Sequence, residues 1–142
     1  MNQHFLSPVK EAVLAHLVTQ SFSCLGKKIR IHSKQEGFPD LKNVQLAIFG
    51  VEEDRNSENN FGCGEDLQFI RNKLYQLFPG NWQTEIADLG NVPKGNSVTD
   101  TYFAVSELIT YLLKKNIIPI IIGGGQDATF SNYKAYDKLE QT

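Results

Sequence analysis

The chain has 142 residues, a hydrophobic fraction of 41%, a charged fraction of 21% and a formal net charge of −2. These values are typical of a soluble globular protein that is long enough to bury a core. They argue against nucleic-acid binding through phosphate neutralisation, and neither a membrane-spanning apolar run nor a signal-peptide pattern is visible.

The N-terminal lead, residues 1 to 40, is expected to hold one short helix and one edge strand. Ser7-Pro8 predicts a helix start, with serine as the N-cap and proline at the first helical position. Apolar residues then recur at helical spacing: Leu6, Val9, Val13 and Leu17. The alternation over 28–32 predicts a brief edge strand, and the turn at 37–40 marks the boundary of the lead.

Residues 41 to 142 alternate between strand and helix patterns. Strands are predicted over 44–49, 83–89 and 117–122, and helices over 65–78, from Ser97 to Lys115 with Asn116 just past the end, and from Ala128. Ser97 and Asp100 form a capping-box pattern. Pro119 cannot donate a ladder hydrogen bond, so it must lie near the start of its strand or in a bulge.

This alternation predicts an α/β fold: a three-layer arrangement in which helices flank a parallel sheet. A parallel sheet needs both faces covered. A sheet of three main strands therefore either dimerises through exposed surface or forms the first half of a larger domain.

Parallel pairing would bring three loops to one edge of the sheet: residues 50–64, 90–96 and 123–127. The last loop begins with three glycines, Gly123, Gly124 and Gly125, followed by Gln126 and Asp127. It is interpreted either as a tight turn with Asp127 as a helix N-cap or as a ligand site. A phosphate-binding site is disfavoured, because the loop matches no phosphate-binding motif. The acidic run Glu52–Asp54 is expected to be a solvated loop face.

Other catalytic patterns are weak. His4, His16 and His32 all lie in the N-terminal lead and are expected to be surface or helix histidines. Cys24 and Cys63 belong to no CxxC pair, so we expect two reduced thiols in a cytoplasmic protein.

Four segments, in order, resemble the ureohydrolases, the family of arginase, agmatinase and formimidoylglutamase. The segment 122–127 resembles their Gly-Gly-Asp-His-Ser signature, and 86–92 resembles their Asp-Leu-Gly-Asp-Val segment. Gly50, Gly62, Gly64 and Arg71 resemble the first strand, entrance loop and opening helix. The helix and Ile-Pro strand before the glycines match as well. The likeness covers about residues 41–142, and the long lead favours the formimidoylglutamase-like branch.

The resemblance implies a partial arginase-like fold and a parent protein that uses two manganese ions to hydrolyse a linear amidine, such as formimidoylglutamate, arginine or agmatine. Gln126 stands where the family has a histidine ligand, and Asp127 would cap the next helix or stand behind the metal. The entrance loop would include Glu53, Asp54, Arg55, Asn59, Asn60 and Phe61. The family's later ligand motifs are absent, so we expect an N-terminal fragment that is inactive and holds no cofactor by itself.

Two alternatives stay open: a non-catalytic relative with a degenerate metal site, and a freestanding α/β domain that dimerises. The expected partners are a small amidine substrate in the parent and a second copy in a homo-oligomer. Neither nucleic acid nor a membrane is expected.

Overall fold

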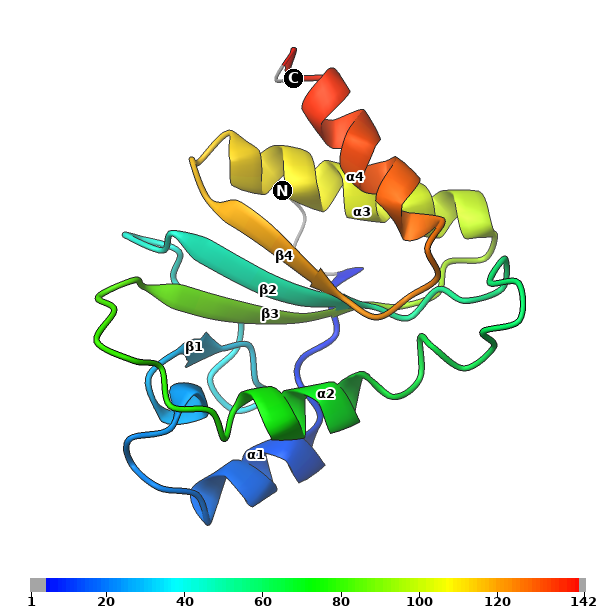
Figure 1. The fold of residues 1–142 in the computed structure, drawn as a ribbon. Coiled ribbons are helices and arrows are strands. Elements are labelled where there is room, and N and C mark those ends of the chain that lie inside the picture. Colours follow the sequence, from blue (N-terminus) through cyan, green and yellow to red (C-terminus); the bar gives the residue numbers. More distant parts are fainter. Residues whose placement is uncertain (1–4, 141–142) are drawn as a thin grey trace.

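Four parallel strands form the centre of the molecule. The computed structural model describes residues 5–140. The strands are β1 (Arg30–Ile31), β2 (Leu46–Val51), β3 (Ile86–Val92) and β4 (Ile118–Ile122). Their order in the sheet is β1-β3-β2-β4, and every pair is parallel. Figure 1 shows β4 along one open edge of this sheet, and the short β1 lies at the other edge.

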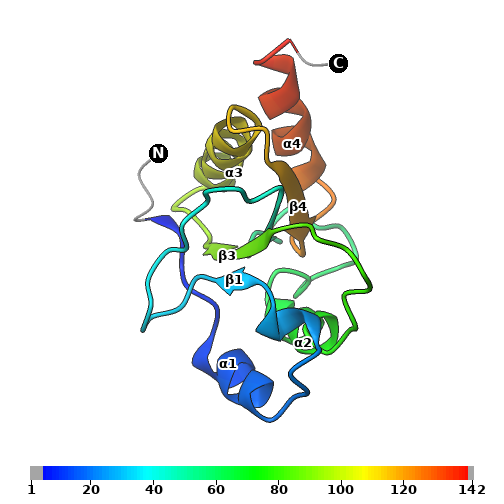
Figure 2. The ribbon, with the colours of Figure 1, turned by 90° about the vertical axis from the view of Figure 1, so that its left-hand side faces the viewer.

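Helices cover both faces of the sheet, which confirms the predicted three-layer α/β fold. α1 (Glu11–Val18) and α2 (Leu67–Leu74) lie on one face, and α3 (Val98–Leu113) and α4 (Ala128–Asp137) lie on the other (Figures 1 and 2). A single 3₁₀ turn, Leu25–Lys27, separates α1 from β1. No helix among residues 5–140 is long and apolar enough to cross a membrane.

The larger apolar core lies between the sheet and α3. Phe49 of β2 and Leu89 of β3 are fully buried against Leu108 and Ile109 of α3. A smaller cluster on the opposite face joins Val13 and Leu17 of α1 to other buried groups near α2. Apolar clusters therefore lie on both faces of the sheet, as a parallel sheet requires.

α3 begins as its sequence predicts, and it ends at Leu113, just before the predicted end. The Ser97 side chain accepts from the Asp100 backbone N–H, and the Asp100 carboxylate accepts from the Ser97 N–H at 2.8 Å. This capping box satisfies two of the backbone donors that a helix start leaves free. Asn116 adopts a left-handed φ of 58° just after the helix, a conformation that asparagine tolerates.

The predicted start of the first helix is wrong. α1 begins at Glu11, after Lys10, rather than at Pro8. Ser7 pairs with Asn91 through two backbone hydrogen bonds, Ser7 N–H to Asn91 O at 2.9 Å and Asn91 N–H to Ser7 O at 2.8 Å. Because these bonds engage the Ser7 backbone in an extended bridge, this serine does not cap a helix.

A strand and a helix have different bounds in the structure from those predicted. The strand expected over 83–89 is β3, Ile86–Val92, because parallel pairing with β2 extends to the Val51–Val92 pair. The helix expected over 65–78 is shorter, since α2 spans Leu67–Leu74 and its last turn gives way to a loop. Pro119 is the second residue of β4, near its start as predicted.

Candidate functional site

Three loops meet at the carboxyl ends of the strands, as parallel pairing predicts. The Gly125 N–H donates to the carbonyl of Glu53 at 2.8 Å, which joins the glycine turn to the loop after β2. Arg55 donates to the Gly95 carbonyl at 3.1 Å, and Lys94 contacts Asp54 at 2.5 Å. The loop after β2 is therefore bonded to both of its neighbours.

The glycine turn needs glycine at each of its three positions. Gly123 and Gly124 have left-handed φ values of 71° and 74°, a backbone conformation that residues other than glycine rarely adopt. A Cβ on Gly123 would overlap Leu67 of α2, and one on Gly125 would overlap Asp127 and Ser57. The turn is thus shaped by close backbone approach to its neighbours.

The two polar residues after the glycines face different surroundings. The Gln126 side chain is exposed, while Asp127 is half-buried at the position before α4. Asp127 makes no side-chain capping bond. Its Oδ2 accepts a hydrogen bond from the Tyr102 hydroxyl on α3, and its Oδ1 is buried with no partner among residues 5–140. Burial, and then the bond to Asp127, raise the pKa of Tyr102.

The acidic run after β2 is not the solvated face that we expected. Glu53 is 1% exposed and Asp54 is 5% exposed, because each carboxylate is paired with a cation of the protein. The side chains of Asn59, Asn60 and Phe61, farther along the loop, are exposed. Of the residues predicted to line the entrance, Arg55, Asn59, Asn60 and Phe61 therefore face solvent, whereas Glu53 and Asp54 do not.

Glu53 is heavily hydrogen-bonded at this edge. Its Oε1 accepts from Arg55 Nε at 2.8 Å, and its Oε2 accepts from the Arg55 guanidinium at 2.5 Å and from Thr101 Oγ1 at 2.7 Å. Hydrogen bonds from Arg55 and, to a smaller extent, from Thr101 together lower the pKa of Glu53 to about 2, against the opposing effect of burial. Lys94 likewise lowers the pKa of Asp54, chiefly by a side-chain hydrogen bond. Both acids are therefore charged at neutral pH.

Sequence patterns did not reveal the buried network beneath this edge. Arg71 of α2, 1% exposed, donates to both carboxylate oxygens of Asp88 at 2.8 and 2.9 Å and to Asn91 Oδ1 at 2.6 Å. The Tyr75 hydroxyl also donates to Asp88, at 2.8 Å. Asn91 in turn donates to Glu52 at 2.8 Å. The available sequence signal was Arg71 at helical spacing from Leu67 and Leu74 of α2, together with Asp88 inside the apolar strand β3.

The residues present do not by themselves fit a manganese site. Residues 5–140 hold no group of three or more His, Cys, Asp or Glu side chains that could bind one ion. His16 lies on α1, and His32 is buried with Nδ1 2.9 Å from the Leu89 carbonyl; His4 lies outside the described residues. Asp88 and Glu53, the most deeply buried acids of this edge, are bonded to arginines.

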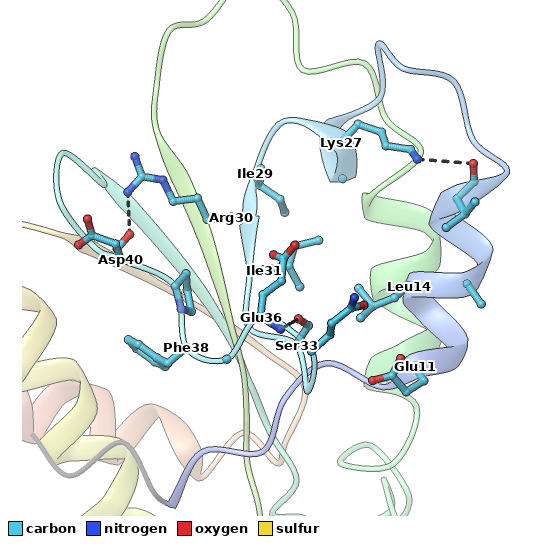
Figure 3. A pocket seen from close by; sticks show the side chains of 16 residues that line it. Glu11, Leu14, Lys27, Ile29, Arg30, Ile31, Ser33, Glu36, Phe38 and Asp40 are labelled. Atoms are coloured by element: carbon cyan, nitrogen blue, oxygen red, sulfur yellow. Dashed lines mark hydrogen bonds between the residues drawn. The ribbon is translucent and has the colours of Figure 1, made fainter.

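A broad hollow of the surface lies away from this edge. A groove of about 860 Å³ runs along α1, β1 and the turn after β1, all within residues 11–40 (Figure 3). Its rim mixes charges of both signs, and Arg30 is already bonded to the Asp40 carbonyl at 2.6 Å. None of its lining residues belongs to the three loops, so it is not part of the candidate site.

Comparison with known proteins finds likeness in structure alone. No protein-family model matches the chain, and no curated protein matches its sequence. Solved structures do match. The formiminoglutamase of Trypanosoma cruzi with Mn²⁺ is 17% identical with a TM-score of 0.63, and the match covers 70% of this chain and 37% of that one.

Two further structures from the same organism agree. An arginase superfamily protein is 16% identical with a TM-score of 0.60, over 72% of this chain and 37% of its own. The oxidised formiminoglutamase with Mn²⁺ at pH 6.0 is 15% identical with a TM-score of 0.62, over 83% and 41%. The chain has the arginase-like fold over this region, and it spans about two fifths of the length of these structures.

Proposed function

We propose that this chain is the N-terminal part of a manganese-type hydrolase that cleaves a C–N bond of a linear amidine such as formimidoylglutamate, arginine or agmatine. The observation that carries the proposal is the position of the glycine turn. The segment that resembles the ureohydrolase signature lies at the carboxyl end of β4, in a fold shared with an arginase superfamily protein. Ligands of open α/β sheets bind at that end.

The chain would supply the scaffold of the site. When bound, a pair of manganese ions would supply the activated water for hydrolysis. Gln126 would occupy the position of the family's histidine, with Asp127 behind it, and the exposed residues Asn59, Asn60 and Phe61 would line the entrance. Because the described residues do not fit a metal by themselves, we assign no catalytic step to them. In this proposal the remaining metal ligands come from the rest of the parent protein.

A non-catalytic relative is the second candidate. It is favoured by the exposed glutamine at the histidine position and by the pairing of Glu53 and Asp54 with Arg55 and Lys94. In such a protein the edge would bind a ligand or a partner without hydrolysing it. A cytoplasmic location is proposed for either candidate, in keeping with the free thiols of Cys24 and Cys63.

Two measurements test the proposal. The purified 142-residue protein should release neither urea nor a formamide product from the three amidines in the presence of manganese. The transcript should then be sequenced beyond the codon for Thr142 and its longest product assayed with the same substrates. Manganese-dependent hydrolysis by that product supports the hydrolase. A longer product that folds but lacks downstream Asp-x-His-x-Asp and Asp-x-Asp motifs and activity supports the non-catalytic relative.

A further inference from the structure

Exposed aromatic side chains gather where two loops of the chain meet. The loop between α1 and β1 is joined to the loop between α2 and β3 by a hydrogen bond from the Leu25 N–H to the Leu77 carbonyl at 2.8 Å. Phe22, in the first loop, is 88% exposed, and Phe78 and Trp82, in the second, are 68% and 78% exposed. Exposed apolar side chains that gather in this way mark an interaction surface.

Two lysines accompany these rings. Lys27 Nζ lies 5.7 Å from the centre of the Phe22 ring, and Lys28 Nζ lies 5.9 Å from the centre of the Phe78 ring. The face of an aromatic ring attracts a cation, so each ammonium is held beside an apolar group. We refer to Phe22, Lys27, Lys28, Phe78 and Trp82 as the aromatic corner.

The charge of this region has one sign. The segments 12–35 and 67–84 hold six of the 14 Lys and Arg residues of the chain and none of its 16 Asp and Glu residues. Arg30 and Arg71 are paired with acids outside these segments, whereas Lys27 and Lys28 form no ion pair with any residue from 5 to 140. The net charge of −2 therefore conceals a basic face, which complements a partner with negative charge.

The aromatic corner lies away from the candidate site. Figure 1 shows the loops that follow α1 and α2 at the left, near the amino ends of the strands, whereas the glycine turn lies at the right. A longer parent would continue from α4, on the face of the sheet opposite to α1 and α2 (Figures 1 and 2). The corner is therefore remote from the three loops and from the point at which further chain would extend.

We propose that the aromatic corner binds the surface of an anionic membrane. Phe22, Phe78 and Trp82 enter the layer of lipid headgroups, and the two lysines contact lipid phosphates. Lysine is depleted in protein–protein interfaces. At a membrane it is favoured, because its apolar stem stays beside the acyl chains while its ammonium reaches the headgroups.

The proposed cytoplasmic location provides such a surface, since the cytoplasmic leaflet carries negative charge. Peripheral contact of this kind needs no membrane-spanning segment, so it is compatible with a sequence in which none is visible. The rest of the chain holds all of the acids, so an anionic surface would repel it and select this face for contact. The inference rests on the surface chemistry of the corner and is independent of the hydrolase proposal.

Trp82 reports on this contact directly, because it is the only tryptophan of the 142 residues. We expect its emission to move to shorter wavelength when vesicles of phosphatidylcholine and phosphatidylserine, in a ratio of about 3:1, are added to the purified protein. Lipids with brominated acyl chains should quench it. Vesicles of phosphatidylcholine alone should give little change, and added salt should weaken binding because it screens the lysines.

Substitutions at exposed positions separate the contributions of charge and apolar surface. In cosedimentation with the mixed vesicles, Lys27→Ala/Lys28→Ala should weaken binding at least tenfold, since each lysine near an anionic surface contributes about fivefold. Phe22→Ser should also weaken binding, and its effect should persist at high salt. Phe130→Ser/Lys134→Ala is the matched control, because Lys134 Nζ also lies over an exposed ring, 4.5 Å from the centre of Phe130, but on α4. The control variant should bind like the wild type.

An acidic protein is the competing partner for this face, and poly-L-glutamate is its probe. Binding of poly-L-glutamate that the lysine variant loses, without binding to the vesicles, overturns the lipid proposal and assigns the corner to an acidic protein. No binding to vesicles, or an equal loss in the control variant, also overturns it.

The longest product of the transcript is tested with the same vesicles. A product that folds but does not bind them shows that later residues cover the corner, which contradicts the proposal. Hydrolysis by that product is measured separately, so the failure of one proposal is distinguishable from the failure of the other.

Discussion

The buried Glu53–Arg55 pair should make the fold sensitive to acid. Glu53 has its pKa lowered from 4.5 to about 2, mainly by hydrogen bonds from Arg55. Since the folded-state pKa is below the unfolded value, the pair stabilises the fold above about pH 4.5. That stabilisation is lost as the pH falls toward 2. The full shift corresponds to at most about 3.4 kcal/mol. Arg55 is 36% exposed, so water screens the pair and we expect about 1–3 kcal/mol.

Urea unfolding of the wild type and of Glu53→Gln between pH 7 and pH 2.5 measures this contribution. Glutamine has a similar shape but cannot form the ion pair, so the variant should be less stable by about 1–3 kcal/mol at pH 7. The difference should shrink to roughly a quarter of its pH 7 value at pH 2.5, which is below the unfolded pKa of 4.5 and approaches the folded pKa of about 2. Glu58→Gln, an exposed residue of the same loop, should change little at either pH. A stability difference that stays constant with pH would refute the electrostatic argument.

Two further substitutions test other parts of the site. Arg71→Met should destabilise the fold by about 3–5 kcal/mol in urea unfolding, because it leaves the buried Asp88 carboxylate unpaired. Arg71→Met/Asp88→Asn should recover part of that loss, and an equal loss in the double variant would contradict the explanation. In a longer parent that binds manganese, Gln126→His should raise manganese affinity about tenfold in titration calorimetry, or about 1.4 kcal/mol. A lower melting temperature with unchanged affinity would instead assign Gln126 to supporting the turn.

Much of the fold could be predicted from local patterns. The period of apolar residues and the capping box located α3, and a long aliphatic run located β4, because these signals lie within one element. The displacement of β3 and the start of α1 could not be predicted in this way. Both depend on pairing with distant residues: Val92 with Val51, and Ser7 with Asn91.

The candidate site was predictable in position but not in chemistry. Parallel topology placed the three loops together, which needs only the order of strands and helices. Whether an acid in those loops is solvated or buried depends on which side chains bond to it. Lys94 lies 40 residues beyond Asp54, and Thr101 lies 48 residues beyond Glu53. No local pattern in the sequence indicates either pairing.

These pairings also predict how the chain responds to metal. Each deeply buried acid of the edge has a protein cation: Arg55 for Glu53, Lys94 for Asp54 and Arg71 for Asp88. Gln126, at the position of the family's histidine, and Asn91, at the second acid of the resembled Asp-Leu-Gly-Asp-Val segment, are neutral amides. The three deeply buried acids of the edge are thus each paired with a cation of the chain, so their burial does not require a divalent ion.

We therefore expect that neither EDTA nor manganese shifts the melting temperature of the 142-residue protein, since a ligand stabilises a fold only by binding it. Thermal melts with EDTA, with manganese and with magnesium as a control for general ionic effects measure this directly. In Lys94→Ala the Asp54 carboxylate loses its cation, so a manganese-dependent rise in melting temperature there, absent in the wild type, would show that Lys94 holds the place of a metal. A rise in the wild type itself would contradict the argument that this edge is balanced by its own side chains.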